Sequence, residues 1–293
     1  MKILILGGSG MLGHRTYLKF KGKFDTYAAF RNFSHYKRYS IFEEKNVIDN
    51  FSTENIEHIK GTLSKIHPNC IINCIGITKQ QKIADDPVQM ITTNSLFPHI
   101  LSSICEEADI KLIHISTDCV FSGEKGNYKE DDFSDAVDLY GRTKFLGEVR
   151  NMNNTLTIRT SIIGRELKTS LGLVEWFLNQ KENMIKGFKN AVFSGFTTDA
   201  LSDIFIDIIQ NHSKISGLYN VSAEPINKFD LLNIIKNSFN VKTEIAAFDD
   251  FYCDRSLDST KFRANTGFKP LLWQTMIDKL AIDTNQYNIW RNL

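Results

Sequence analysis

The sequence predicts an α/β protein with a doubly wound parallel sheet and a smaller, mixed C-terminal lobe. Three features carry this prediction. Short apolar runs alternate with longer amphipathic stretches through the first half of the 293 residues, a glycine-rich turn follows the first run, and longer helical stretches predominate near the C-terminus. Strands that alternate with helices are typical of a sheet covered by helices on both faces.

Five apolar runs are expected to form the first strands, because apolar residues on both faces mark strands that are buried on both sides. These strands are Ile3–Leu6, Tyr27–Phe30, Val47–Ile48, Cys70–Ile75 and Leu112–Ile115. The amphipathic stretches between them predict helices at Met11–Lys21, Thr53–Ile66 and Thr92–Ala108. A further strand is expected at Thr155–Thr160.

The second half is expected to form most of the smaller lobe. Helices are predicted at Leu171–Asn179, Asp199–Gln210, Lys228–Phe239 and Trp273–Ala281. Short strands are expected at Phe188–Phe193, Gly217–Val221 and Thr243–Phe248. We therefore divide the chain into residues 1–165, which form the sheet domain, and residues 166–293, which form predominantly the second lobe, with short segments free to cross back.

Composition and charge narrow the classes of function. The 35 Lys and Arg against 34 Asp and Glu give a formal net charge of +1, so no global field would hold the chain on nucleic acid or an anionic membrane. The five cysteines form no Cys-x-x-Cys pair, and the first apolar run is too short for a signal peptide. We expect a cytoplasmic protein with reduced thiols, without nucleic-acid or membrane partners. The scattered histidines show no metal-binding spacing, so no metal site is predicted.

The turn from Gly7 to Gly13 reads Gly-Gly-Ser-Gly-Met-Leu-Gly and opens the first predicted helix. Glycines let the backbone turn tightly and approach a pyrophosphate, and the helix N-terminus offers free N–H groups and a partial positive charge. This is the context that the dinucleotide fingerprint of a Rossmann fold requires, although a purely structural turn is the alternative. The cofactor-binding residues assigned here are Gly7, Gly10, Met11, Leu12 and Gly13.

The end of the second strand indicates which dinucleotide is bound. An NAD site usually carries an acidic residue there, but this chain reads Ala29-Phe30-Arg31-Asn32. The guanidinium of Arg31 can form paired hydrogen bonds with a 2′-phosphate, and a solvated arginine is the alternative. We therefore expect NADPH, and NADH is not excluded.

Other residues near the ends of strands are candidates for the same site. Asp49 can accept from an adenine amino group or cap the following helix. The chain at Cys74, Ile75 and Gly76 must pass close to the cofactor. Asn94 either takes part in a proton relay or packs between helices.

Tyr140 and Lys144 are expected four residues apart on one helical face. A phenol with an ordinary pKa of about 10 is a poor acid or base at neutral pH, and a neighbouring cation favours its ionised form. Tyr17 and Lys21 have the same spacing, so spacing alone is not specific. Thr117 distinguishes the first pair, because it ends the fifth strand where open α/β sheets bind ligands and can donate to a carbonyl oxygen that Tyr140 protonates.

Taken together, these motifs resemble those of extended short-chain dehydrogenases/reductases, most closely the dTDP-4-dehydrorhamnose reductase group. The block Ser-Thr-Asp-x-Val-Phe-x-Gly discriminates this group, because related 4,6-dehydratases carry an Asp-Glu pair after their threonine and this chain has Asp118-Cys119. The match is good over residues 1 to about 165 and extends beyond only in order and rough pattern. The segments that carry it are Gly7–Gly13, Asn73–Gly76, Ser116–Gly123, Tyr140–Lys144 and Gly147-Glu148.

The resemblance implies catalytic roles for Thr117, Tyr140 and Lys144, and sugar contacts for Asp118 and Cys119. The family usually has an aromatic residue in place of Cys119. Two further departures concern Thr198, where the family's Pro-Thr reads Thr-Thr, and Arg255, which begins Arg-Ser-Leu-Asp in place of Asn-Ser-x-Leu. We assign Thr198 and Arg255 to substrate binding, with Arg255 as a phosphate contact or else a solvated side chain.

The implied reaction is NADPH-dependent reduction of the 4-keto group of a nucleotide-linked 4-keto-6-deoxysugar, a step in the synthesis of deoxysugar and polysaccharide precursors. The implied partner is a nucleotide-diphosphate sugar. Two alternatives remain open: a regulatory subunit of the same fold that binds the cofactor without turnover, and an NAD-dependent nucleotide-sugar epimerase. A homodimer is compatible with the sequence, which does not decide the nucleotide base or the configuration of the sugar.

Overall fold

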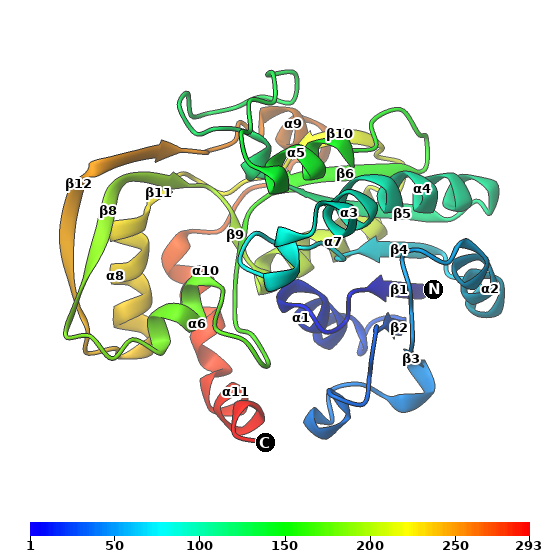
Figure 1. The fold of residues 1–293 in the computed structure, drawn as a ribbon, viewed down its shortest axis with the longest axis horizontal. Helices are drawn as coiled ribbons and strands as arrows, with labels where there is room; N and C mark the ends of the chain where they lie inside the picture. Colours follow the sequence, from blue (N-terminus) through cyan, green and yellow to red (C-terminus); the bar gives the residue numbers. More distant parts are fainter.

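A computed structural model describes all of residues 1–293, and its main body is a seven-stranded parallel sheet (Figure 1). The strands lie in the order β3-β2-β1-β4-β5-β6-β10, and every neighbouring pair is parallel. This arrangement confirms the predicted doubly wound fold. The strands are β1 (Lys2–Leu6), β2 (Asp25–Ala29), β3 (Val47–Ile48), β4 (Cys70–Asn73), β5 (Lys111–Thr117), β6 (Thr155–Thr160) and β10 (Gly217–Asn220).

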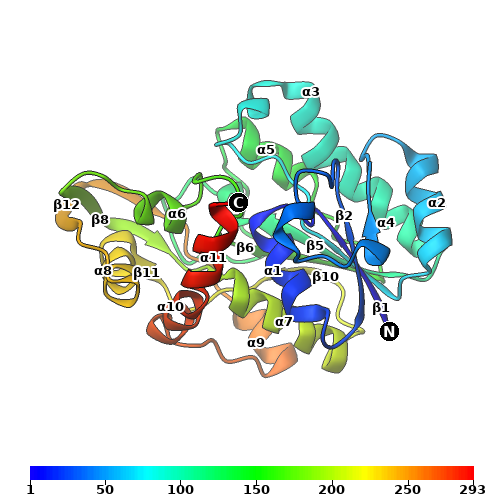
Figure 2. The same cartoon turned by 90° about the horizontal axis from the view of Figure 1, so that it is seen from below.

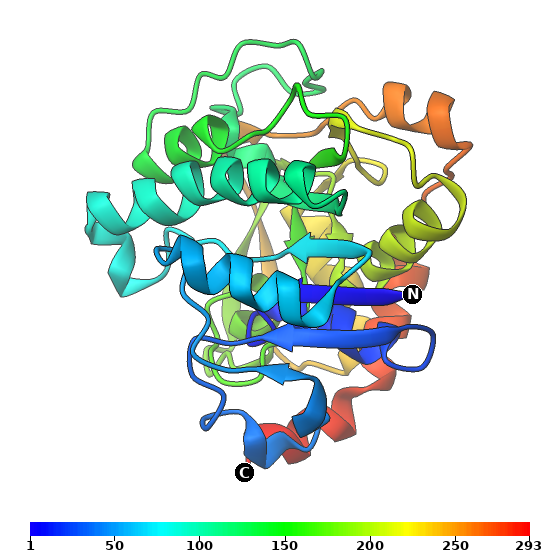
Figure 3. The ribbon, with the colours of Figure 1, turned by 90° about the vertical axis from the view of Figure 1, so that its right-hand side faces the viewer.

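Helices cover both faces of this sheet (Figure 3). One face packs on an apolar cluster that includes Tyr17 and Phe205, and the other packs on a cluster that includes Leu63 and Leu101. The double cover explains the apolar residues on both faces of each strand. None of the helices combines the length and the apolar character that a membrane crossing requires. The helices of these two faces are α1 (Met11–Phe20) with α7 (Thr198–Asn211), and α2 (Ile56–Ile66) with α4 (Phe97–Glu107).

The second lobe contains a three-stranded sheet in the order β11-β8-β12, with α8 against it (Figure 1). The strands β7 and β9 form a short two-stranded sheet. In the chain, β7 follows β6 of the main sheet, and β9 follows β8 of the lobe. The strands are β7 (Ile162–Ile163), β8 (Met184–Phe193), β9 (Phe196–Thr197), β11 (Ile226–Asn227) and β12 (Glu244–Asp254). The remaining helices are α3 (Pro87–Met90), α5 (Leu139–Leu146), α6 (Leu173–Leu178), α8 (Lys228–Phe239), α9 (Thr260–Thr266), α10 (Trp273–Ile282) and α11 (Thr284–Arg291).

Two segments from beyond residue 165 belong to the main body. The strand β10 pairs with β6, and α7 packs against α1. The chain therefore crosses back after β9 and leaves the main sheet again after β10. The division at residue 165 remains a prediction.

Local capping moved two helix starts from their expected positions. The helix expected from Thr53 begins at Ile56, because the side chain of Asn55 accepts from the backbone N–H of His58 at 2.9 Å. The helix expected from Thr92 begins at Pro87, where the carboxylate of Asp86 accepts from the first-turn N–H groups. A π-helical stretch over residues 91–96 joins α3 to α4.

Candidate active site

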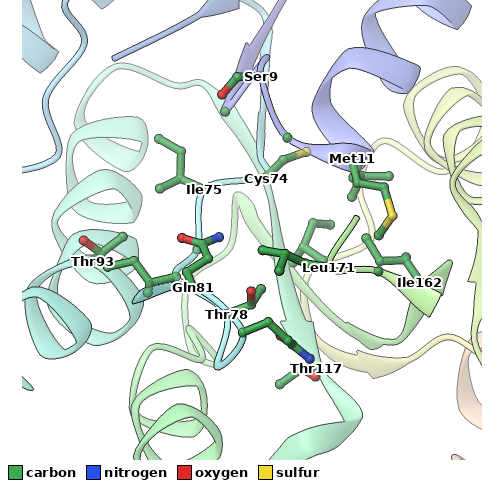
Figure 4. Close-up of a pocket in the computed structure, with 18 of the residues that line it drawn as sticks. Ser9, Met11, Cys74, Ile75, Thr78, Gln81, Thr93, Thr117, Ile162 and Leu171 are labelled. Carbon is green, nitrogen blue, oxygen red and sulfur yellow. The ribbon is translucent and has the colours of Figure 1, made fainter. Parts of the chain in front are cut away.

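A cavity of about 880 Å³ lies at the carboxyl ends of the strands of the main sheet (Figure 4). Open α/β sheets bind ligands at this edge. Residues beyond 165 also line it, among them Phe193, Lys228 and most of the segment 166–172. The structure brings most of the predicted residues into this one cavity, namely Gly7, Gly10, Met11, Leu12, Arg31, Cys74, Ile75, Gly76, Thr117, Asp118, Cys119, Tyr140 and Lys144.

A side chain would clash with the backbone at two glycines of the turn, Gly7 and Gly13. Gly7 has φ +83°, and a Cβ atom on it would lie 3.2 Å from the backbone of Cys74. A Cβ atom on Gly13 would lie 2.1 Å from the carbonyl oxygen of Gly7, so Gly13 serves the close packing of α1 rather than lining the cavity. No side chain caps α1 at Gly10, and its first turn carries no acidic residue. This cradle fits the pyrophosphate of a dinucleotide.

The side chain of Arg31 stands at the rim of the cavity beside Tyr36. It is exposed and makes no hydrogen bond or ion pair with the rest of the chain. The phenol of Tyr36 lies close enough to Ser9 for the serine to lower its pKa. This end of the cavity therefore offers a free guanidinium close to the glycine turn.

The end of β5 and the start of α5 meet at the other end of the cavity. The hydroxyl of Thr117 accepts from the backbone N–H of Cys119 and donates to Asp118 Oδ1, both at 3.1 Å. Asp138 caps α5 by accepting from the N–H of Gly141 at 2.7 Å, which fixes the first turn that carries Tyr140. The phenol of Tyr140 also lines this end of the cavity, close enough to Thr117 for the threonine to lower its pKa. The two hydroxyl groups can therefore act on one oxygen atom.

The pKa of Tyr140 is raised above its ordinary value, whereas a neighbouring cation was expected to lower it. Burial raises the pKa of Tyr140, the nearby Cys119 raises it further, and the neighbouring Thr117 hydroxyl lowers it. The ammonium of Lys144 donates to the carbonyl oxygen of Ile115 at 2.7 Å. Burial lowers the pKa of Lys144 to about 8. The phenol is protonated at neutral pH, which is the form that can donate a proton.

Two residues assigned to the cofactor lie outside the cavity lining and have structural partners. Asp49 accepts from the backbone N–H groups of Phe33 and Asn50, at 2.7 Å and 2.8 Å, and thereby orders the loop after β2. It does not cap α2, since Asn55 does. Asn94 is buried and bonds both the N–H and the carbonyl oxygen of Ile77 at 2.9 Å. The structure thus gives Asn94 a role in holding the strand-end loop.

The two outlying substrate candidates also stand apart from the lining. Thr198 is buried at the start of α7, where its side chain would meet a Cβ atom on Gly164. Arg255 Nε donates to the carbonyl oxygen of Phe121 at 2.9 Å, and Nη1 lies 3.8 Å from Cys119 Sγ. Arg255 is therefore adjacent to the reactive end of the cavity through Cys119, whereas Thr198 packs behind it.

Comparison with known proteins places the chain in a family. The family model described as RmlD substrate binding domain matches residues 1–285. The chain belongs to this family. The match confirms the predicted resemblance to extended short-chain dehydrogenases/reductases of the dTDP-4-dehydrorhamnose reductase group.

Individual relatives of this RmlD-type chain match over shorter lengths. A probable low-salt glycan biosynthesis reductase, Agl14, of Haloferax volcanii is 33% identical over 41% of this chain and 42% of its own length. The dTDP-4-dehydrorhamnose reductase of Mycolicibacterium smegmatis is 40% identical over 27% of this chain and 24% of its own length. The match thus spans less than half of either relative. Methionine adenosyltransferase 2 subunit beta of Danio rerio is 23% identical over 82% of this chain and 74% of its own length.

Solved structures share the fold along the whole chain. A dTDP-4-dehydrorhamnose reductase from Bacillus anthracis, in complex with NADP, has a TM-score of 0.77 and 20% identity, and covers 97% of this chain and 99% of its own. A hypothetical dTDP-4-dehydrorhamnose reductase from Sulfolobus tokodaii has a TM-score of 0.75 and 25% identity, and covers 93% of this chain and 98% of its own. A nicotinamide dinucleotide, the expected cofactor, is thus bound in a protein of this fold.

Sequence reasoning missed Lys228 among the residues of this RmlD-type site. Lys228 begins α8, lines the cavity, and places its ammonium 4.3 Å from the centre of the Phe193 ring. Burial lowers the Lys228 pKa, and the nearby Asp118 opposes that shift. Its position at the start of a predicted helix was visible in the sequence, but no spacing links it to Thr117.

Proposed function

We propose that this chain uses NADPH to reduce the 4-keto group of a nucleotide-linked 4-keto-6-deoxysugar. The observation that carries the proposal is one cavity that contains both the glycine turn and the hydroxyl groups of Thr117 and Tyr140. A cofactor site next to a proton donor is the arrangement that carbonyl reduction requires. Bound NADPH would supply the hydride.

The chain's own residues suit NADPH. The turn from Gly7 to Gly13 would hold the pyrophosphate at the N-terminus of α1, and Cys74, Ile75 and Gly76 would form the opposite wall. The guanidinium of Arg31 has no partner in the protein and would bind the 2′-phosphate. Lys144 would hold the nicotinamide ribose.

Proton transfer would be divided between two hydroxyl groups. As negative charge develops on the ketone oxygen, Thr117 donates a hydrogen bond to it and Tyr140 gives it a proton. The raised pKa of Tyr140 keeps the phenol protonated until an alkoxide forms nearby. The Thr117 hydroxyl, which donates to Asp118 in the absence of substrate, would turn its O–H from Asp118 to the ketone oxygen while still accepting from the N–H of Cys119.

The substrate's phosphate groups would meet positive charge from the second lobe. Lys228 lines the cavity near Asp118, and Arg255 lies behind Cys119. We assign Lys228 and Arg255 to the diphosphate of the nucleotide sugar, with Cys119 and Asp118 facing the sugar. The nucleotide sugar is thus the small-molecule partner that this cavity suits.

The decisive experiment follows NADPH absorbance with a panel of 4-keto-6-deoxy nucleotide sugars and identifies the product by mass spectrometry and NMR. Steady oxidation of NADPH with formation of the 4-hydroxyl sugar is expected. Binding of NADPH without turnover on the whole panel would refute the reductase assignment.

That second outcome would favour a regulatory subunit. The likeness to methionine adenosyltransferase 2 subunit beta, over 82% of this chain, is the observation behind this alternative. It predicts binding of NADPH and of a partner enzyme, with no oxidation of NADPH. An epimerase would instead retain NAD through purification and leave the redox state of the sugar unchanged.

A further inference from the structure

We infer that the C-terminal helix α11 is a clasp that holds the cofactor cavity in its binding shape, with Arg291 as a positioning residue. The family match ends at residue 285, so most of α11 (Thr284–Arg291) lies beyond it. The helix nevertheless contacts two opposite walls of the cavity. Because the inference concerns NADPH, it rests on the proposed function.

The first wall is the segment of residues 166–172, most of which line the cavity. This segment is neither helix nor strand, so it has no ladder of backbone hydrogen bonds to hold it. Arg291 supplies such support: Nη1 donates to the carbonyl oxygens of Glu166 and Thr169, at 2.7 Å and 2.8 Å, and Nη2 donates to Ser170 Oγ at 2.8 Å. One planar guanidinium thus fixes three points of the wall.

This wall spans the cavity between the glycine turn and the loop after β2. Near the turn, a Cβ atom on Gly172 would lie 3.5 Å from Met11 Sδ, and both Met11 and Leu171 face the cavity (Figure 4). At the other end, the ammonium of Lys168 lies 5.0 Å from the centre of the Tyr36 ring. A shift of the wall would therefore change the space available to a dinucleotide.

The second contact of α11 is with α1, just behind the glycine turn (Figure 2). The hydroxyl of Tyr287 bonds His14 Nε2 at 2.7 Å, and His14 Nδ1 bonds the carbonyl oxygen of Gly10 at 2.8 Å. Asp283, which precedes α11, pairs with Arg15 at 2.6 Å. The helix α11 thus joins the turn that would hold the pyrophosphate to the wall that faces it.

These contacts predict an effect on cofactor affinity rather than on chemistry. Arg291 bonds neither Thr117 nor Tyr140, so replacing Arg291 leaves the proton donor in place. If the wall is ordered in only a fraction of molecules, the apparent dissociation constant rises by the inverse of that fraction. We expect Arg291→Met to raise the NADPH dissociation constant about tenfold, with kcat at saturating NADPH unchanged.

The experiment measures NADPH binding by its fluorescence and hydrogen exchange of residues 166–172 in the full-length protein. Arg263→Met is the matched control, because Arg263, in α9, pairs with Glu224 at 3.0 Å and does not line the cavity. Faster exchange of the segment and weaker binding are expected for Arg291→Met, and neither for the control. Tyr287→Phe, which keeps the ring and removes the bond to His14, is expected to weaken binding by a smaller factor.

The outcomes separate this inference from the proposed function. A wild-type protein that binds no NADPH would overturn the proposed function and this inference with it. If the wild-type protein binds NADPH and both Arg291→Met and Tyr287→Phe have the same NADPH dissociation constant as wild type, only the inference about α11 is overturned. A lower melting temperature in Arg291→Met without weaker binding would show a purely structural helix and would also overturn it.

Discussion

The hydroxyl of Thr117, at the end of β5, and the phenol of Tyr140, in the first turn of α5, lie near each other at one end of the cavity, where Thr117 lowers the pKa of Tyr140. The sheet edge and a capped helix start position them independently, so their approach does not depend on a flexible loop. Both line the cavity that contains the glycine turn. A ketone oxygen placed between them would meet two donors.

This relationship predicts the effect of Tyr140→Phe. The ring and its packing remain, so the NADPH dissociation constant should stay within about twofold, while kcat falls about a hundredfold or more because the proton donor is lost. Tyr17→Phe is the matched control, since Tyr17 is also four residues before a lysine and its hydroxyl accepts from the N–H of Glu43 at 3.1 Å. Full activity in Tyr140→Phe would contradict the assigned role.

The pKa of Lys144 predicts a pH dependence of stability. Burial lowers it from 10.5 to about 8, so the folded state holds its proton less tightly than the unfolded state. Burial of the charged ammonium therefore lowers the free energy of unfolding below pH 8, and this loss disappears as the pH rises toward 10.5. By linkage, the loss is about 3 kcal/mol at most.

Urea unfolding of wild type and Lys144→Met from pH 7 to pH 10 tests this sign. The stability of the variant relative to wild type should be greatest at pH 7 and should decrease toward pH 10. A constant difference would contradict the lowered pKa. Activity should be lost in Lys144→Met at every pH, whereas Lys21→Met, whose ammonium donates to the carbonyl oxygen of Ile41 at 3.1 Å, should remain active.

A site residue could be predicted from the sequence where the residues next to it in the chain determine its position. The glycine turn and Thr117 were predictable because each lies where a strand ends, and parallel strands end at one edge of the sheet. Lys228 was not predictable, because only the tertiary packing of the second lobe brings it to the cavity. Arg291 was not predictable either, because only the packing of α11 brings it to the cavity wall at Glu166. The hydrogen bond of Lys144 to the carbonyl oxygen of Ile115 was not predictable either, because spacing along a helix does not show what lies beside it in the fold.

His14 predicts sensitivity to acid. Burial lowers its pKa from 6.5 to about 4, so the unfolded state binds more protons between these values and stability falls as pH drops from 6.5 to 4. The loss attributable to this group is up to about 3 kcal/mol. His14→Gln should be less stable at pH 7, because the bonds to Gly10 and Tyr287 are altered, but should lose less stability on acidification. Parallel unfolding curves at pH 7 and pH 4.5 measure this, and equal acid losses would refute it.

Arg31 predicts the preference between cofactors. Its guanidinium would form charge-assisted hydrogen bonds with the 2′-phosphate of NADPH, a group that NADH lacks. Arg31→Ala should raise KM for NADPH about tenfold or more and leave KM for NADH within about twofold. Arg38→Ala is the control, because the Arg38 guanidinium is engaged with the hydroxyl of Tyr39 at 3.0 Å. A uniform loss with both cofactors would assign Arg31 to loop structure instead.

Lys228 predicts how the substrate is held. Lys228, at the start of α8, lines the cavity with its ammonium 4.3 Å from the centre of the Phe193 ring and interacts electrostatically with Asp118. Replacement by methionine keeps the length and apolar contact of the side chain but removes the charge, so KM for the nucleotide sugar should rise about tenfold or more while the NADPH dissociation constant stays unchanged. Lys228→Arg should recover most of the affinity, because a guanidinium also binds phosphate.

Lys186→Met, which removes the ammonium that lies 4.0 Å from the Phe248 ring outside the cavity, provides the matched control. If Lys228→Met binds the sugar nucleotide as wild type does, the diphosphate must be bound elsewhere, and Arg255 becomes the residue to replace.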